Sequence, residues 1–173
     1  DDKGFIKTNN YLETTAKNIW ALGDIAGKFL FKHSANLEAQ YVYNNAILNK
    51  KNKVDYNAMP HAIFSSPQVA GVGLREQDLN EKKINYAKGV YNYINSGMGI
   101  ALQDNDGFVK IFADRKTRKI LGCHILGTDA STLIHEVIVA MKAGLTVNAI
   151  DQAVHIHPAL SEVVQRAVRN IEW

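Results

Sequence analysis

Two histidines, a proline and a glutamate stand close together in the stretch HIHPALSEVV, residues 155–164. A histidine exchanges protons near neutral pH, and a neighbouring carboxylate can orient its ring and stabilise the imidazolium. His157 directly precedes Pro158, and Glu162 follows within the same stretch. This spacing fits a proton-acceptor pair of His157 and Glu162. It fits equally a helix start, in which Pro158 opens the first turn and Glu162 favours the positive helix end.

Metal binding is the second chemistry that this stretch suggests. His155 and His157 would share one face if the chain between them were extended. A structural zinc site needs about four ligands, and neither a cysteine nor a third ligand stands at matching spacing. The sequence therefore predicts no metal site.

Phosphate binding by glycine-rich loops is a third possibility. Two glycine pairs occur, Gly71 with Gly73 and Gly97 with Gly99. Neither pair is followed by the third glycine and the helix that would bring a helix N-terminus to a pyrophosphate. We interpret both pairs as turns at strand ends.

Two further side chains could take part in chemistry. Asp24 ends the apolar run NIWALGD at a glycine turn, where a carboxylate can accept hydrogen bonds from a ligand's hydroxyls or cap the following structure. Spacing alone favours the cap. Cys123, the single cysteine, lies in ILGCHIL, which is typical of a buried strand. The sequence contains no redox pair of cysteines.

The composition limits the class of protein. The chain has 173 residues, is 46% hydrophobic and carries a formal net charge of +3 from dispersed basic residues. This charge pattern gives no footprint for nucleic acid. No apolar run approaches the roughly 20 residues that span a bilayer, and the first residues lack the layout of a signal peptide. We expect a cytoplasmic protein that binds neither nucleic acid nor membrane.

The elements that must position these residues fall into two parts. Residues 4–7 and 18–24 are predicted as strands, and residues 34–48 as a helix with Ser34 as its N-cap. The polar, basic run NKKNK follows this helix, and the pattern then changes to short alternating segments. The sequence predicts a domain boundary within this polar, basic segment.

The second part reads as an α+β domain. Its predicted strands are residues 61–64, 68–72, 86–94, 107–113 and 119–126, of which the last two form a hairpin. Helices are predicted at 76–83, around an apolar stripe from Leu133 to Met141 that ends at Gly144, and from Pro158 onward. This order predicts an antiparallel sheet with helices packed on one face.

Several segments together resemble one family, the flavin-dependent pyridine nucleotide disulfide oxidoreductases. They are DDKGFIKTNNYLETTAKNIWALGDIAG, LFKHSANLEA, FSSPQVAGVGL, GFVKIFADRKTRKILGCHILGTDAS and HIHPALSEVV. Within that family the sequence is most similar to the dihydrolipoamide dehydrogenases. The resemblance covers nearly the whole chain, and the order and spacing of the segments make it specific.

The resemblance implies roles for four residues. Asp24 matches the family's FAD-binding aspartate, which accepts hydrogen bonds from the ribityl chain, and Ala35 matches a backbone N–H donor to the flavin ring. His157 would act at the partner subunit's flavin and redox disulfide, where it accepts a proton from the dithiol substrate. Glu162 would hold and polarise its imidazole. A base is needed because a thiolate, and not a thiol, attacks a disulfide.

The resemblance also implies an organisation. Residues 1–56 match the end of an FAD-binding domain, and residues 57–173 match the interface domain through which two subunits dimerise. The glycine-rich FAD motif, the two redox cysteines and the NAD domain have no counterpart in this sequence. We therefore expect a C-terminal portion that is inactive alone, does not retain FAD and belongs to an FAD- and NAD-dependent enzyme. Its expected partners are a second copy and components of a 2-oxo acid dehydrogenase complex. The alternatives are a non-catalytic dimerisation module and a relative of glutathione reductase.

Overall fold

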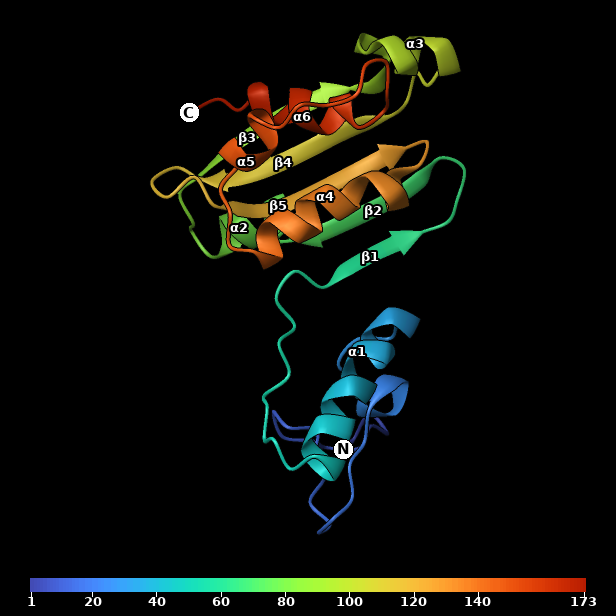
Figure 1. The fold of residues 1–173 in the computed structure, drawn as a ribbon, viewed down its shortest axis with the longest axis vertical. Helices are drawn as coiled ribbons and strands as arrows, with labels where there is room; N and C mark the ends of the chain where they lie inside the picture. Colours follow the sequence, from blue (N-terminus) through green and yellow to red (C-terminus); the bar gives the residue numbers. More distant parts are fainter. The chain divides into compact units, whose positions relative to one another are not determined.

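The computed structural model describes residues 1–173, which form two compact units, Asp1–Tyr56 and Asn57–Trp173 (Figure 1). Each unit has its own internal packing and is described by itself below. The division falls after the basic run at which the sequence predicts a domain boundary.

The first unit contains no continuous strand, so the predicted strands at 4–7 and 18–24 are wrong. Only the isolated bridges Thr8 to Thr14 and Glu13 to Trp20 join extended segments here. A strand needs a neighbour that pairs with its N–H and C=O groups along its length, and this unit supplies none. A 3₁₀ turn, η1 (Gly23–Ala26), follows the NIWAL segment.

The helix of the first unit begins earlier than the sequence predicts. α1 spans Lys32–Val42 and continues as a π-helical turn, η2 (Tyr43–Ile47). Its N-cap is Phe31 and not Ser34, whose hydroxyl lies inside the first turn and donates to the Phe31 carbonyl at 2.7 Å. Serine often bonds to the backbone in this way, and such local bonds blur the sequence signal for a helix start.

A buried carboxylate connects α1 to the turn that carries Asp24. Glu38 is fully buried and accepts hydrogen bonds from the Gly23 amide at 2.5 Å and from the Tyr56 hydroxyl at 2.7 Å. Burial and the neighbouring Glu38 raise the pKa of Tyr56, which keeps its hydroxyl a donor. Gly23 has a φ of 69°, a conformation that glycine adopts without strain. Glu38 therefore fixes the backbone immediately before Asp24.

The second unit is built on a five-stranded antiparallel sheet in the order β1-β2-β5-β4-β3. Its strands are β1 (Pro60–Ile63), β2 (Gln68–Gly73), β3 (Tyr86–Asn92), β4 (Phe108–Asp114) and β5 (Ile120–Gly127). β4 and β5 form the predicted hairpin, with Ile111 opposite Cys123. All five strands lie where the alternation of apolar residues predicts them, and the α+β fold class is confirmed.

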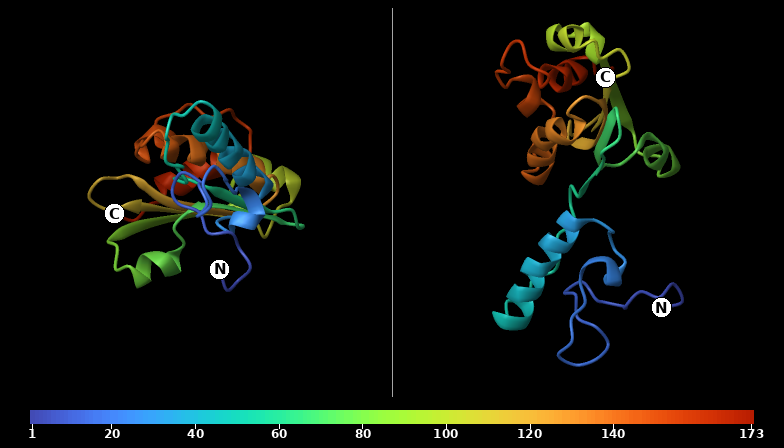
Figure 2. Two further views of the ribbon diagram at one scale, coloured as in Figure 1. Left: turned by 90° about the horizontal axis from the view of Figure 1, so that it is seen from below. Right: turned by 90° about the vertical axis from the view of Figure 1, so that its right-hand side faces the viewer.

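Helices cover the sheet. α4 (Ala130–Lys142) contacts β2 and β5, α6 (Glu162–Arg169) contacts β3 and β4, and the short α5 (Asn148–Asp151) lies between them. Figure 2 shows these three helices on one side of the sheet and α2 (Glu76–Glu81) on the other. α3 (Gly97–Leu102) follows β3 through the 3₁₀ turn η3 (Tyr93–Asn95).

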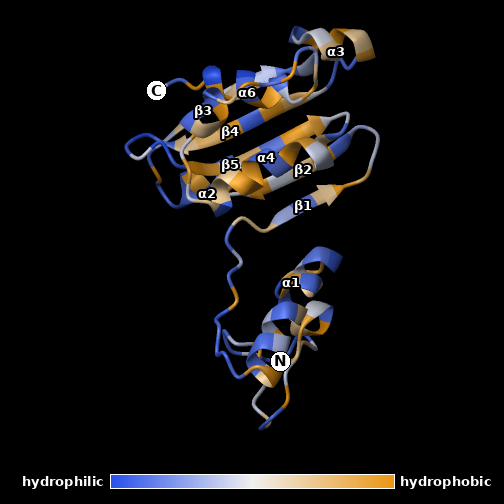
Figure 3. Cartoon of the chain, in the orientation of Figure 1, coloured by the Kyte–Doolittle hydropathy of each residue, from blue (hydrophilic) through white to orange (hydrophobic).

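The core lies between the sheet and the three helices. Figure 3 shows apolar residues along the central strands and α4. The fully buried side chains include Val109 and Ile111 of β4, together with Val137 of α4 and Val163 of α6. Each valine buried in this way stabilises the fold by about 1.5–3 kcal/mol. α6, which carries Glu162, and α4 are thus held on the sheet by hydrophobic packing.

Two local predictions in this unit need correction. Gly97 and Gly99 begin α3 and do not form a strand-end turn, and Gly71 lies inside β2. α6 begins at Glu162 and not at Pro158. The peptide bond before Pro158 is cis, and residues 158–161 form a turn ahead of the helix.

Candidate functional site

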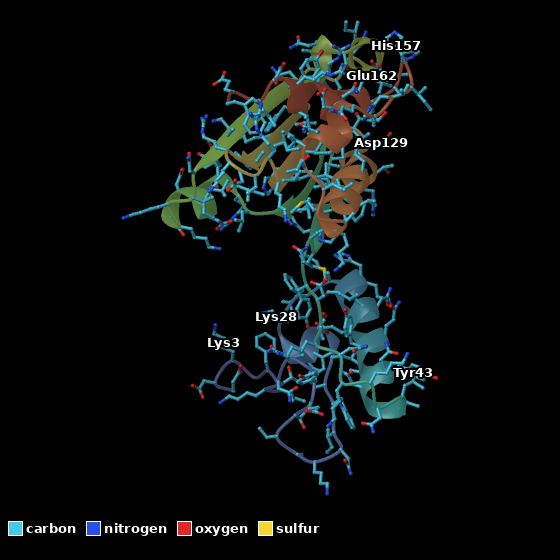
Figure 4. All side chains as sticks on the ribbon, turned by 60° about the vertical axis from the view of Figure 1, so that its left-hand side comes forward. Lys3, Lys28, Tyr43, Asp129, His157 and Glu162 are labelled. Carbon is cyan, nitrogen blue, oxygen red and sulfur yellow. The ribbon has the colours of Figure 1, made fainter.

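His157 and Glu162 form a hydrogen-bonded pair at one end of the second unit. The Nδ1 atom of His157 lies 3.1 Å from Oε1 and 3.0 Å from Oε2 of Glu162. The imidazole is 74% exposed, whereas the carboxylate is only 12% exposed. Figure 4 shows the two side chains together beside the start of α6. The pair predicted from spacing therefore exists as a contact.

The carboxylate decides which ring nitrogen is free. An ionised carboxylate only accepts hydrogen bonds, so Nδ1 of His157 carries the hydrogen that it donates to Glu162. In the neutral ring, Nε2 is then the unprotonated nitrogen, on the exposed imidazole. This arrangement leaves a proton acceptor at Nε2, with a negative charge behind the ring that stabilises the imidazolium once a proton is taken up.

Glu162 is held in its ionised form by its neighbours. Burial raises its pKa, but the Ala159 amide, which donates to Oε2 at 3.1 Å, and the adjacent His157 outweigh this and hold the pKa below its ordinary value. Glu162 thus caps the turn at Ala159 and orients the histidine at once. Glu162 therefore acts in both ways that its spacing suggested, as the partner of His157 and as a carboxylate at the start of a helix.

The start of α3 lies beside His157. A Cβ added to Gly97 would lie 3.7 Å from Cε1 of His157, an ordinary contact distance. Ser96 caps α3 by accepting a hydrogen bond from the Gly99 amide at 3.0 Å. The start of α3 therefore borders the imidazole without covering it.

His155 does not lie beside His157 in a shared ligand set. Its side chain is 8% exposed and contacts Glu136 of α4, while His157 contacts Glu162. The chain contains no group of three or more histidine, cysteine or carboxylate side chains that could hold a metal ion. The two histidines of HIHP belong to separate pairs.

Asp24 and Ala35 lie in the first unit. The Asp24 carboxylate is exposed at η1 and accepts no hydrogen bond from the chain, so it is free to receive one from a ligand. The Ala35 N–H already donates to the Phe31 carbonyl at 3.1 Å, within the first turn of α1. Ala35 also lies against the turn, since a Cβ on Gly23 would meet its Cβ at 3.3 Å.

Three residues near these sites escaped sequence reasoning. Glu38 supports the turn before Asp24, and Glu136 and Gln165 contact the segment that carries His157. All three are polar residues whose side chains make contacts within the chain: Glu38 and Gln165 are buried, and Glu136 is partly buried. A buried polar residue needs a partner, which is the one signal that could have indicated them.

Comparison with known proteins identifies the second unit. Residues 59–168 match the family described as pyridine nucleotide-disulphide oxidoreductase, dimerisation domain. The chain belongs to this family. The match covers the whole sheet, α4, α5, all of α6 except its last residue, and both His157 and Glu162.

Curated relatives match over nearly the whole chain. Mycothione reductase of Mycobacterium tuberculosis is 35% identical over 96% of the chain, and dihydrolipoyl dehydrogenase of Cupriavidus necator is 34% identical over 99%. The alignments cover 38% and 36% of those two proteins, so the chain spans little more than a third of their length.

Solved structures share the fold. The HOCl-induced flavoprotein disulfide reductase RclA of Escherichia coli, in its Cu(II) complex, matches with a TM-score of 0.90 and 25% identity, over 98% of this chain and 38% of that one. LpdA of Mycobacterium tuberculosis matches with a TM-score of 0.88 and 23% identity, over 95% of this chain and 36% of that one.

None of the helices combines the length and the hydrophobicity that a membrane span needs.

Proposed function

We propose that this chain supplies the proton acceptor of a dihydrolipoamide dehydrogenase, an FAD- and NAD-dependent enzyme that oxidises dihydrolipoamide to lipoamide. The observation that carries the proposal is the contact between His157 and Glu162. Nδ1 is committed to the carboxylate, and the unprotonated Nε2 belongs to a ring that is 74% exposed. An exposed base backed by a mostly buried carboxylate is what a dithiol substrate requires.

The role of the base follows from thiol chemistry. Nε2 of His157 takes a proton from one thiol of the substrate, and the thiolate attacks one sulfur of the enzyme's redox disulfide. That disulfide bond breaks as a mixed disulfide forms, and the second substrate thiol then displaces the enzyme sulfur, giving lipoamide and a reduced dithiol. Glu162 stabilises the imidazolium that results from the first step. FAD, when bound, carries the electrons from the enzyme's dithiol to NAD.

The first unit fits part of an FAD site. Asp24 offers a free, exposed carboxylate to ribityl hydroxyls, and Glu38 fixes the backbone just before it. Ala35 fits less directly because its N–H is already bonded to Phe31. A contact from Ala35 to the flavin ring requires a three-centre hydrogen bond, an arrangement that is common at helix ends.

The same proposal includes a homodimer. Val154 is 100% exposed and Ile156 is 77% exposed, and both lie in the segment that leads to His157. Apolar side chains exposed beside a reactive group favour a surface that another chain covers. We assign this surface to a second copy, whose disulfide His157 would serve. The proposal that the enzyme is a dihydrolipoamide dehydrogenase further includes docking to components of a 2-oxo acid dehydrogenase complex and a cytoplasmic location.

A second candidate is reduction of a low-molecular-weight disulfide with a nicotinamide cofactor, which runs the same thiol chemistry in reverse. It is favoured by the 35% identity to mycothione reductase, which is as high as the 34% identity to the dihydrolipoyl dehydrogenase of Cupriavidus necator or slightly higher. A non-catalytic dimerisation module is the remaining alternative. The two enzymatic candidates differ in substrate but share the base His157.

The test is single-turnover reduction of the complete flavoenzyme that carries this sequence. Dihydrolipoamide should reduce its flavin rapidly, and His157→Gln should slow this step by about 100-fold or more, the usual loss for a general base. Reduction of the flavin by NADH should stay unchanged, because it needs no thiol deprotonation. Equal rates in the two proteins with dihydrolipoamide would overturn the role of His157. Turnover only with mycothiol disulfide or glutathione disulfide would select the second candidate.

A further inference from the structure

His155 lies two residues before His157, but its ring is enclosed and tethered. Its Nδ1 atom is 3.1 Å from the carbonyl oxygen of Ala153, and its Nε2 atom is 3.0 Å from Oε2 of Glu136. The side chain is only 8% exposed. Both ring nitrogens are therefore used in contacts within the chain, and neither is offered to a substrate.

The donors and acceptors around His155 require one bridging proton. A carbonyl oxygen only accepts, so Nδ1 must carry a hydrogen. The neutral ring then has a lone pair at Nε2, which faces the carboxylate of Glu136, another acceptor when ionised. A contact at 3.0 Å between these atoms needs a proton, either on Nε2 or on Glu136. The pair shares that proton.

The surroundings of Glu136 favour retention of the proton that it shares with His155. Burial raises the pKa of Glu136, although the bond to His155 acts in the opposite direction. The other titratable group that faces this carboxyl is the thiol of Cys123 on β5, whose pKa is raised by burial and by the charge of Glu136. That thiol stays neutral near neutral pH. Only His155 and Glu136 exchange the bridging proton.

The tether connects two helices to the segment before His157. Glu136 belongs to α4, and Gln165 of α6 donates from Nε2 to the Ala153 carbonyl at 2.8 Å and to the Asp151 carbonyl at 3.0 Å. Ala153 thus accepts from both His155 and Gln165. The rest of the segment is exposed in the single chain, so within one chain these bonds and the contact of His157 with Glu162 hold it in place.

We propose that His155 and Glu136 are positioning residues, and that the proton they share fixes residues 153–157 so that His157 is presented to its substrate. The inference rests on the proposed function of His157. When the proton leaves, two acceptors face each other, or the ring moves its hydrogen to Nε2 and loses the bond to Ala153. Either change loosens the segment. Presentation of His157 therefore weakens as the pH rises.

Glu136→Gln separates the tether from its proton. A glutamine amide can donate to a bare Nε2 or accept from a protonated one, so it satisfies His155 in both states. Glu136→Ala can do neither. His135→Gln is the matched control, because His135 is exposed and immediately precedes Glu136 on α4. The four proteins are compared as complete flavoenzymes between about pH 6 and about pH 9.

The first measurement is amide hydrogen exchange of the peptide around residues 152–158, followed by mass spectrometry, which requires no activity. Wild type and His135→Gln should lose protection as the pH rises, after correction for intrinsic exchange. Glu136→Gln should stay protected throughout, and Glu136→Ala should be unprotected at every pH. Equal protection in all four proteins would overturn the tether.

The second measurement is the rate of flavin reduction by dihydrolipoamide. Glu136→Ala should lower it about tenfold, with little change in KM, and Glu136→Gln should restore it and remove the decline at high pH. The positioning role would be overturned if Glu136→Ala loosened the segment without changing the rate of flavin reduction. This conclusion requires that His157→Gln inactivates the same enzyme. Retained activity in His157→Gln would instead count against the proposed function, while the exchange result would still decide the tether.

Discussion

The carbonyl oxygen of Ala167 in α6 lies only 2.0 Å from the point where a Cβ on Gly89 of β3 would stand. No side chain fits between the two backbones at this position. Because α6 begins at Glu162, the close approach of helix and strand sets where that carboxylate lies. The position of Glu162 in the candidate site therefore depends on Gly89, which is far from Glu162 in the sequence.

Gly89→Ala should push α6 away from β3. We expect the free energy of unfolding to fall by about 1–3 kcal/mol, the usual cost of overpacking, together with slower dithiol oxidation as Glu162 shifts. Urea denaturation and single-turnover kinetics measure the two effects. Gly97→Ala is the control for the stability measurement, since the nearest neighbour of its Cβ would be 3.7 Å away. An alanine tolerated equally at both positions would contradict the packing of α6 on β3.

Glu162 should stabilise the fold only while it is ionised. Its folded-state pKa is lowered, so its contribution is present above the ordinary value of 4.5 and is lost as the pH falls through the lower folded value. The stability difference between wild type and Glu162→Gln should therefore shrink on acidification below about pH 4.5. Urea denaturation across this range measures it. Glu81→Gln, an exposed change at the end of α2, should show no comparable loss.

Asp24 should contribute to flavin affinity. Asp24→Ala in the complete enzyme removes a charged acceptor, which is worth about 1.5–3 kcal/mol, or about a tenfold to hundredfold weaker retention of FAD. The flavin content of the purified protein, read from its visible absorbance, checks this. Asp2→Ala, another exposed carboxylate of the same unit, is the control. Full flavin content in Asp24→Ala would remove this residue from the site.

Ile156 should anchor the subunit interface. Ile156→Asp places a charge on an apolar surface that we assign to a second copy, so we expect a shift from dimer to monomer and loss of turnover. Sedimentation velocity measures the oligomeric state. Ile63→Asp is matched in chemistry and lies on the edge strand β1, where the side chain is 59% exposed. Ile63→Asp should remain a dimer, and a dimer that persists in Ile156→Asp would remove Ile156 from the interface.

The sheet could be predicted from the sequence because its signals are local. Alternation of apolar residues marks all five strands, and the charged turn between Asp114 and Lys119 marks the central hairpin. The strands expected at 4–7 and 18–24 failed because apolar alternation reports a buried face and says nothing of a pairing partner. Strand formation needs both a buried face and a neighbouring strand to pair with.

The site could be predicted only in part. His157 and Glu162 are close in sequence, so their spacing indicated a contact before the structure placed them together. Glu136 could not be found in this way, because its contact with His155 depends on how α4 lies across the sheet. Sequence reasoning paired His155 with His157, its neighbour in the chain, whereas its partner comes from another helix.

The strand order of the sheet also has a kinetic consequence. β3, β4 and β5 are neighbours in both sequence and space, whereas β2 meets β5 only after the chain between them has folded back. Closing that long loop costs more chain entropy than closing a hairpin, and it slows pairing. α6 docks on β3 and β4, but α4 docks on β2 and β5. α4 follows β5 directly in the chain, whereas α6 is separated from β3 and β4 by β5, α4 and α5. During folding we therefore expect α4, with Glu136, to dock on β5 first, and the Glu162 side of the site to follow.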